Sequence, residues 1–136
     1  MKRLQRGVPL SANDFQELPL FVFGTLRRGE SNYHFLAGRY DRCLAAMLHD
    51  FKRTMTAHGF PGVVPSPGEN VTGELFFIRP AIFQETLRQC DILEDLPPGQ
   101  LVGRYYRRTR VVVDSVEGSV TAWAYVDPQG LSSSPP

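Results

Sequence analysis

The sequence predicts one α+β domain built around a curved or closed β-sheet. Several short segments rich in β-branched and aromatic residues are separated by Gly and Pro, which is typical of strands joined by turns. Residues 81–94 instead show helical spacing, with Phe83, Leu87 and Cys90 on one apolar stripe. The strands show little strict alternation, which favours a curved or closed sheet. With 136 residues, 42% of them hydrophobic, the chain is long enough for one core but not for two.

Residues 19–126 are predicted to form the folded domain, between a flexible leader at 1–18 and a flexible tail at 127–136. The leader is polar and shows no sustained period, and the tail is dominated by Pro, Gly and Ser. Neither segment offers enough apolar surface to bury.

The first half of the domain is predicted from its apolar runs and their breaks. Leu20–Phe23 is a short apolar run that ends at Gly24, as expected for a buried strand that breaks into a loop. A helical turn is expected at Asn32–Leu36 and a strand at Arg42–Leu48. Residues 59–68, GFPGVVPSPG, contain three prolines and three glycines, which predict an irregular connection.

The second half contains the predicted helix between strands. Val71–Ile78 is β-rich and is expected to be a strand. Pro80 is tolerated in the first turn of the helix, and the sequence Pro-Pro-Gly at 97–99 ends it. The last two predicted strands, Tyr105–Val113 and Val120–Val126, are joined through a turn near Glu117 and Gly118.

The charge balance argues against several classes of protein. Fifteen basic and fourteen acidic residues leave a formal charge of +1. Proteins dedicated to nucleic acids or membrane surfaces usually carry a strong cationic excess, so small molecules are the expected partners. No apolar run approaches the roughly 18 residues of a membrane-spanning helix. Polar residues stand where a signal peptide would have its hydrophobic core, so we expect a cytoplasmic protein.

The sequence offers no metal or cofactor site. Cys43 and Cys90 are far apart and form no C-x-x-C pattern, so we expect two reduced thiols. His34, His49 and His58 lack the spacing of metal ligands. The G-x-S-x-G elbow, the Walker loop and the dinucleotide-binding fingerprint are also absent from the sequence.

Arginines gather in one of the last strands: Arg104, Arg107, Arg108 and Arg110. Nucleic-acid binding is one interpretation of this cluster. Arg108 and Arg110 alternate with Thr109 and Val111, which favours the alternative of a solvated strand face.

Glu94 is the most informative polar residue. It continues the helical stripe of Phe83, Leu87 and Cys90, and it lies at the negative end of the helix dipole. Both desolvation and the dipole would raise its pKa, as suits a group that gains and loses a proton near neutral pH. Nearby Asp91 and Asp95 would raise it further. Considered alone, a single glutamate at a helix end is more often simply hydrated.

The segment FGTLRRG at 23–29 directly follows a buried strand. Gly24 lacks a Cβ, so a ligand can approach the backbone closely, and consecutive N–H groups here can bind a carboxylate or an oxyanion. The alternative is an ordinary strand-to-loop turn.

Taken together, six segments in order resemble the γ-glutamylcyclotransferase-like superfamily, which is also called AIG2-like and includes γ-glutamylamine cyclotransferases. They are VFGTLRRGESNYH at 22–34, FPGVVP at 60–65, VTGELFFI at 71–78, CDILEDL at 90–96, YRRT at 106–109 and AWAYV at 122–126. The resemblance covers about residues 20–126, and six motifs in the correct order are more specific than any one of them.

The resemblance implies a mixed-sheet β-barrel with flanking helices and a cavity at one end. It implies that Glu94 is the catalytic acid/base, that Phe23, Gly24, Thr25 and Leu26 hold the substrate, and that Tyr106 lines the pocket. The implied reaction cyclises a γ-glutamyl group to 5-oxoproline and releases an amine or amino acid. Neither a metal nor an organic cofactor is needed for it.

Two departures from the family pattern keep an alternative open. Phe23 stands where the family usually has Tyr, and the stretch between Glu94 and Tyr106 is longer than in compact relatives, so that it would cover the cavity. The alternative is a non-catalytic module that binds γ-glutamyl compounds or other small molecules on the same fold. The sequence indicates neither the leaving group nor the oligomeric state.

Overall fold

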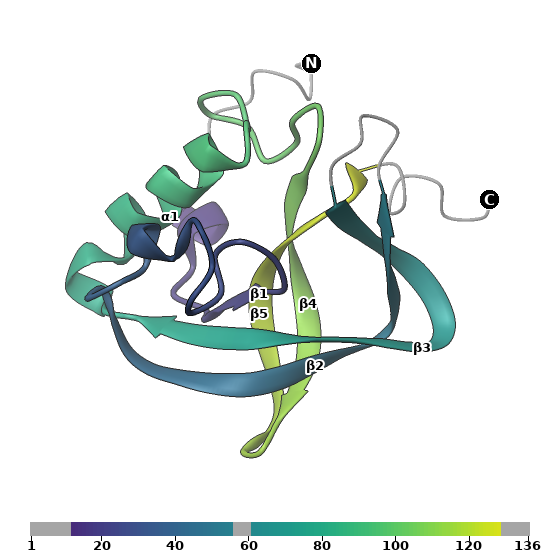
Figure 1. Cartoon of the computed structure of the whole chain (residues 1–136). Coiled ribbons are helices and arrows are strands. Elements are labelled where there is room, and N and C mark those ends of the chain that lie inside the picture. The colour runs from purple at the N-terminus through teal and green to yellow at the C-terminus, as the bar shows by residue number, and fades with distance from the viewer. Residues whose placement is uncertain (1–11, 56–60, 129–136) are drawn as a thin grey trace.

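The computed structural model describes residues 12–55 and 61–128, in which the chain forms a closed five-stranded barrel with a helix beside it (Figure 1). Its 3₁₀ helices are η1 (Ala12–Phe15), η2 (Tyr33–Phe35) and η3 (Pro80–Ile82). The remaining elements, in chain order, are β1 (Leu20–Val22), β2 (Tyr40–Met55), β3 (Pro61–Ile78), α1 (Phe83–Leu93), β4 (Arg107–Ser115) and β5 (Gly118–Val126).

The barrel is a mixed sheet in the order β1–β3–β2–β4–β5. β1 runs antiparallel to β3 and parallel to β5, so this short strand closes the barrel. β2 and β3 form a long curved ribbon that sweeps around the other strands (Figure 1). The predicted α+β class with a mixed-sheet barrel is confirmed.

The segment 59–68 differs from its prediction as an irregular connection. Residues 61–68 belong to β3, and residues 59 and 60 lie outside the described part of the chain. Within β3 the ladder to β2 skips residues 66–69. Pro67 and Gly68 stand in this bulge, where a missing N–H costs no ladder hydrogen bond and Gly68 takes a φ of 86°. The proline and glycine content therefore marks a bulge within a strand.

β1 is buried on both faces, which accounts for its continuous apolar sequence. Phe21 packs with Phe23 in a core cluster inside the barrel. Leu20 and Val22, on the other face, belong to a separate core cluster that contains the buried side chains of α1. The predicted apolar stripe of the helix is confirmed, with three buried members: Phe83, Leu87 and Cys90. The barrel thus has one core inside it and another beneath α1.

Residues 14–18 pack onto the domain, although they were predicted as part of a flexible leader. Phe15 and Leu18 contact the core cluster beneath α1. The carbonyl oxygen of Gln16 accepts a 2.9 Å hydrogen bond from Trp123 Nε1. Two apolar side chains and backbone carbonyl groups hold this segment. Such contacts leave no periodic pattern in the sequence, so they were not predicted. Residues 1–11 and 129–136 lie outside the described part of the chain.

Arg108 on β4 is buried, contrary to the predicted solvated face. Its Nε and Nη2 donate to the two carboxylate oxygens of Asp91 on α1 at 2.7 and 3.0 Å. Its Nη1 donates to the carbonyl oxygen of Asp14 at 2.6 Å, and its guanidinium lies 4.6 Å from the Trp123 ring centroid. Strand alternation identifies two faces but does not show which of them a helix covers, and α1 covers this one.

Cys43 is half-buried and Cys90 is buried, and both are free thiols. Burial is the largest cause that raises the pKa of Cys90 to about 12, so this thiol stays protonated at neutral pH. Across residues 12–55 and 61–128, no helix has the length and apolar character needed to cross a membrane.

Gly73 allows β1 to approach β3 closely. A Cβ at this position would overlap the carbonyl oxygen of Val22 and lie 2.8 Å from Cζ of Phe21. Neither group is able to retreat cheaply, because one is backbone and the other is a ring packed in the barrel.

We expect Gly73→Ala to lower the free energy of unfolding by about 1–3 kcal/mol, because the added methyl group overpacks the β1–β3 contact. Thermal unfolding followed by circular dichroism would report this as a lower Tm. Gly24→Ala is the matched control, since a Cβ there meets no atom within 4 Å. Equal Tm values for the two variants would contradict the close approach.

The buried pair of Asp91 and Arg108 predicts a large effect of Asp91→Asn. The variant leaves a buried guanidinium without its counter-charge, so we expect a loss of about 3 kcal/mol or more, measured by urea unfolding. The exposed pair Arg42–Glu117, with an N–O distance of 2.6 Å, provides the comparison. Glu117→Gln is expected to cost less than about 1 kcal/mol. Similar losses in both variants would show that burial of the Asp91 pair is unimportant.

Candidate active site

The candidate site lies at the end of the barrel where β1 and β5 finish and β3 and β4 begin. The topology brings these ends together, because β1 and β5 are parallel to each other and antiparallel to β3 and β4 respectively. A pocket opens there, and six of its lining residues were predicted from the sequence: Phe23, Gly24, Thr25, Leu26, Glu94 and Tyr106. Four further lining residues were not: Phe21, Val22, Pro61 and Tyr125.

Glu94 is positioned by the way α1 ends. The helix stops at Leu93, so Glu94 is its C-cap residue and lies one position beyond the predicted last turn. The amides of Asp95 and Leu96 donate to the carbonyls of Ile92 and Asp91 at 3.0 Å each, which is the hydrogen-bond pattern of a Schellman motif. Asp95 takes the left-handed conformation of this motif, with φ 63°. Buried Leu96 anchors the chain after the turn.

Burial raises the pKa of Glu94 to about 7. Desolvation is the largest cause, and the negative charge of Asp91 adds to it. Asp91 itself stays paired with Arg108, so the two neighbouring carboxyl groups have different environments. A carboxyl group with this pKa is able both to accept and to donate a proton near neutral pH.

The segment 23–26 turns directly after β1 and presents backbone N–H groups. The Gly24 carbonyl accepts a 3.1 Å hydrogen bond from the Arg27 amide, which closes a turn. The Thr25 carbonyl and hydroxyl accept bonds of 2.8 Å each from the amide and the side chain of Asn32. Among the residues that the structure describes, none accepts a hydrogen bond from the amides of Gly24, Thr25 or Leu26. The segment therefore has unused donors beside the pocket.

Two tyrosines complete the polar part of the lining. The hydroxyl of Tyr106 donates to the Pro61 carbonyl at 2.7 Å, and burial is the main cause that raises its pKa to about 12. The hydroxyl of Tyr125 donates to Asp91 Oδ1 at 2.6 Å, and burial raises the pKa of Tyr125 well above its usual value. Both phenols stay protonated at neutral pH. Glu94 is thus the lining residue, among those described, that titrates near pH 7.

The residues missed by sequence reasoning share one property, which is that tertiary pairing places them. Pro61 was assigned to an irregular connection, and it reaches the pocket only because β3 pairs with β2 up to Met55. Tyr125 looks like an ordinary member of an apolar strand. Conversely, no residue of 95–105 lines the pocket, so the expectation that this stretch covers the cavity is not supported.

The arrangement suits proton transfer and the binding of an anionic oxygen. One wall carries a carboxyl group whose pKa lies near neutral pH, and another carries backbone amides that have no acceptor within residues 12–55 and 61–128. The rest of the lining is largely aromatic and aliphatic. Within the described ranges, no group of three or more His, Cys, Asp or Glu residues is arranged to hold a metal ion.

Comparison with known sequences finds relatives of one kind. A family model described as γ-glutamyl cyclotransferase, AIG2-like, matches residues 20–135. A putative γ-glutamylcyclotransferase of Vibrio cholerae is 34% identical over 113 residues, which cover 79% of each chain. The γ-L-glutamyl-butirosin B γ-glutamyl cyclotransferase of Niallia circulans is 32% identical over 112 residues, which cover 79% of this chain and 65% of that protein.

Solved structures share the fold. A yeast γ-glutamyl cyclotransferase specific to glutathione gives a TM-score of 0.62 at 12% identity, over 81% of this chain and 68% of the yeast chain. A second γ-glutamyl cyclotransferase gives a TM-score of 0.54 at 19% identity, over 81% of this chain and 66% of the other. Since the family model spans most of the sequence and the V. cholerae relative matches at 34% identity, the chain belongs to the γ-glutamyl cyclotransferase, AIG2-like family.

Proposed function

We propose that this protein cyclises a γ-glutamyl group to 5-oxoproline and releases the attached amine or amino acid, with Glu94 as general acid and base. The observation that carries the proposal is the placement of the Glu94 carboxyl in the same pocket as the segment 23–26, whose Gly24, Thr25 and Leu26 amides have no acceptor among the described residues. Burial there raises the pKa of Glu94 to about 7. Family membership supports the class of reaction, and the Niallia relative is named for a γ-glutamyl substrate.

The proton balance of the reaction requires a group of this kind. The α-amino group of the substrate is a cation at neutral pH, and it becomes a nucleophile only after losing a proton. The Glu94 carboxylate accepts that proton, and the amine then attacks the γ-carbonyl carbon of the same molecule. The protonated Glu94 next donates to the leaving nitrogen, which is too basic to depart without a proton. The C–N bond breaks, and Glu94 returns to the carboxylate. The ring nitrogen still carries one proton more than the lactam does, and Glu94 passes that proton to the released amine, which becomes a cation.

The segment 23–26 supplies the second requirement, which is stabilisation of the tetrahedral intermediate. Attack on the γ-carbonyl places negative charge on its oxygen. The amides of Gly24, Thr25 and Leu26 are the donors proposed to bind that oxygen. Because the nucleophile and the carbonyl belong to one molecule, the pocket also has to fold the substrate, and its aromatic walls suit that role.

Phe23 bears on the alternative of a non-catalytic binding module. Its ring packs in the barrel interior and is nearly buried, so the hydroxyl of the family's usual Tyr is absent there. The backbone of residues 23–26 does not depend on that hydroxyl. The proposed chemistry uses the backbone amides and Glu94, and we therefore favour the enzyme.

The decisive experiment compares the wild-type protein with Glu94→Gln. A library of γ-glutamyl amino acids and γ-glutamyl-ε-lysine is incubated with each protein, and 5-oxoproline is detected by mass spectrometry. We expect wild-type turnover to fall by about 10²- to 10⁴-fold in the variant, because Gln neither accepts nor donates the proton. Glu85→Gln on the exposed face of α1 is the matched control.

Turnover that persists unchanged in Glu94→Gln would refute the role of this residue. Calorimetry with the same library distinguishes the alternative. Binding of a γ-glutamyl compound without any 5-oxoproline from the wild-type protein would favour the non-catalytic module.

The raised pKa of Glu94 predicts opposite effects of pH on activity and on stability. Glu94 must be ionised to accept the first proton, so kcat/KM should rise through about pH 7 and fall about tenfold for each unit below it. The folded state holds this proton more tightly than the unfolded state, so Glu94 costs stability as pH rises from about 4.5 to 7. Glu94→Gln should therefore raise the Tm at pH 8, with a smaller difference at pH 5. A lower Tm at pH 8 would contradict the buried carboxylate.

A further inference from the structure

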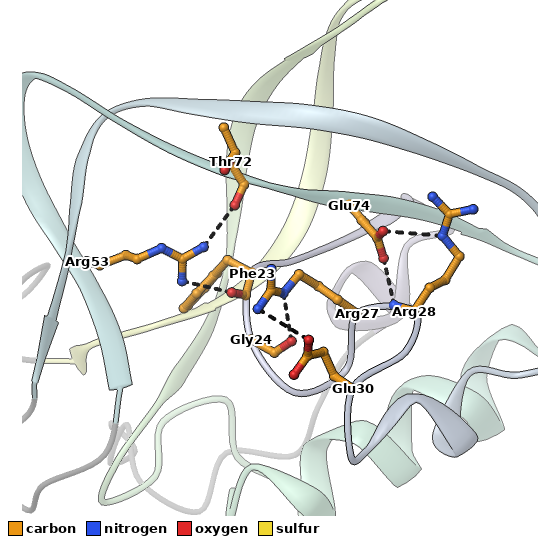
Figure 2. A network of polar contacts seen from close by, with 8 residues as sticks. All are labelled: Phe23, Gly24, Arg27, Arg28, Glu30, Arg53, Thr72 and Glu74. Carbon is orange, nitrogen blue, oxygen red and sulfur yellow. Dashed lines mark hydrogen bonds and ion pairs between the residues drawn. The ribbon is translucent and has the colours of Figure 1, made fainter.

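Three consecutive carbonyl groups of the pocket segment are each held by a residue outside the pocket lining. The Phe23 carbonyl accepts a 2.8 Å hydrogen bond from Arg53 Nη1, and the Gly24 carbonyl accepts one of 2.9 Å from Arg27 Nε. The Thr25 carbonyl accepts its bond from the Asn32 amide. Figure 2 shows the two guanidinium groups converging on the neighbouring carbonyls of Phe23 and Gly24.

The direction of the N–H groups follows from these contacts, because the peptide unit is planar. In a planar trans peptide, the C=O of one residue and the N–H of the next point in opposite directions. A carbonyl held on one side therefore turns the following amide to the other side. The N–H groups of Gly24 and Thr25 therefore point away from Arg53 and Arg27 respectively. Gly24 and Thr25 line the pocket, and the two arginines do not.

We propose that Arg27 and Arg53 are positioning residues that aim and polarise the Gly24 and Thr25 amides, which bind the oxyanion of the cyclisation. The inference rests on the proposed function and assigns to it two side chains that never touch the substrate. Each cation binds the carbonyl of the peptide unit whose N–H is the donor, and a charge-assisted bond there strengthens that donor. In this way positive charge acts on the oxyanion through the backbone, although no Lys or Arg side chain lines the pocket among the described residues.

The way Arg53 is held supports a dedicated role. Its Nη2 donates to the Thr72 carbonyl at 3.1 Å, and its guanidinium lies 5.7 Å from the Phe23 ring centroid. One side chain thus joins the pocket segment to β3. Burial and the nearby charge of Arg27 lower the pKa of Arg53, so the fold keeps two like charges close together at this segment. The hydrogen bonds to the two carbonyls offset that repulsion, as does the Glu30 carboxylate, whose Oε2 lies 3.9 Å from Arg27 Nη2.

The segment has an independent anchor, so the two arginines can be replaced without releasing it. The Arg28 amide donates to Glu74 Oε1 at 2.8 Å, and Arg28 Nε donates to Glu74 Oε2 at 3.2 Å (Figure 2). The turn bond from the Arg27 amide to Gly24 also survives any change of the Arg27 side chain. Substitutions at Arg27 and Arg53 therefore change the direction and polarity of the amides more than the path of the chain.

The kinetic test uses Arg53→Gln and Arg27→Gln, with the γ-glutamyl compound that the wild-type protein turns over fastest. Arg79→Gln is the matched control, because Arg79 Nη1 also donates to a loop carbonyl, that of Gly38 at 2.7 Å, away from the pocket. We expect kcat to fall about tenfold in each of the first two variants, with KM within about twofold and the midpoint of the pH profile still near 7. Arg53→Lys, which keeps the charge, should recover part of the loss.

Four kinetic results would overturn the proposal. Three of them are an unchanged kcat, an increase in KM alone, and a loss of kcat as large in Arg79→Gln as in the two test variants. A shifted pH midpoint would also overturn it, because Glu94 rather than the amides would then be affected.

A second measurement decides the inference without turnover. Backbone ¹⁵N relaxation reports the order of the Gly24 and Thr25 amides in the absence of any ligand. We expect their order parameters to fall in Arg53→Gln and Arg27→Gln and to stay at wild-type values in Arg79→Gln. If the wild-type protein forms no 5-oxoproline from any compound, the proposed function fails. Rigid amides in all three variants would defeat the positioning role whatever the outcome for turnover.

Discussion

The buried carboxylate of Asp91 is the interaction that fastens the helix to the barrel. It accepts two hydrogen bonds from Arg108 on β4 and one from Tyr125 on β5. Arg108 in turn binds the carbonyl of Asp14 in the N-terminal segment. One carboxyl group thus connects α1, two barrel strands and the chain that precedes β1. Removing any partner leaves a buried charge or donor uncompensated, which costs stability.

The same carboxylate shapes the environment of the site. Asp91 lies one helical turn before Glu94, so fixing Asp91 against Arg108 also fixes where α1 delivers Glu94 to the pocket. The negative charge of Asp91 adds to the effect of burial, and together they raise the pKa of Glu94 to about 7. A site with this property is unfavourable for the fold, since an ionised Glu94 is poorly solvated there. Asp91, paired with Arg108, and Glu94, without such a partner in the described residues, thus stand three residues apart in different environments.

Features that are encoded within a few consecutive residues can be predicted from the sequence. The apolar run ending at Gly24, the stripe of Phe83, Leu87 and Cys90, and the position of Glu94 on that stripe are all local patterns. Other features depend on partners that are remote in the chain. The sequence predicted a solvated strand face for Arg108, because its partner Asp91 lies on a different element, the helix α1. Pro61 lines the pocket because β3 pairs with β2. The proline-rich composition of this segment gave no sign of that strand pairing.

Barrel closure gives the pocket a place in the order of folding. β1 meets β5 through the pairing of Leu20 with Trp123, so the contact joins nearly opposite ends of the described chain and carries the largest loop-closure entropy in the sheet. Val22 and Tyr125 lie on the two sides of this seam and both line the pocket. A nascent chain that has not yet emerged through β5 therefore has no complete site, however much of the β2–β3 ribbon has formed. A ligand that fills the pocket binds residues on both sides of the seam, and so it stabilises the closed barrel over any form in which β1 has parted from β5.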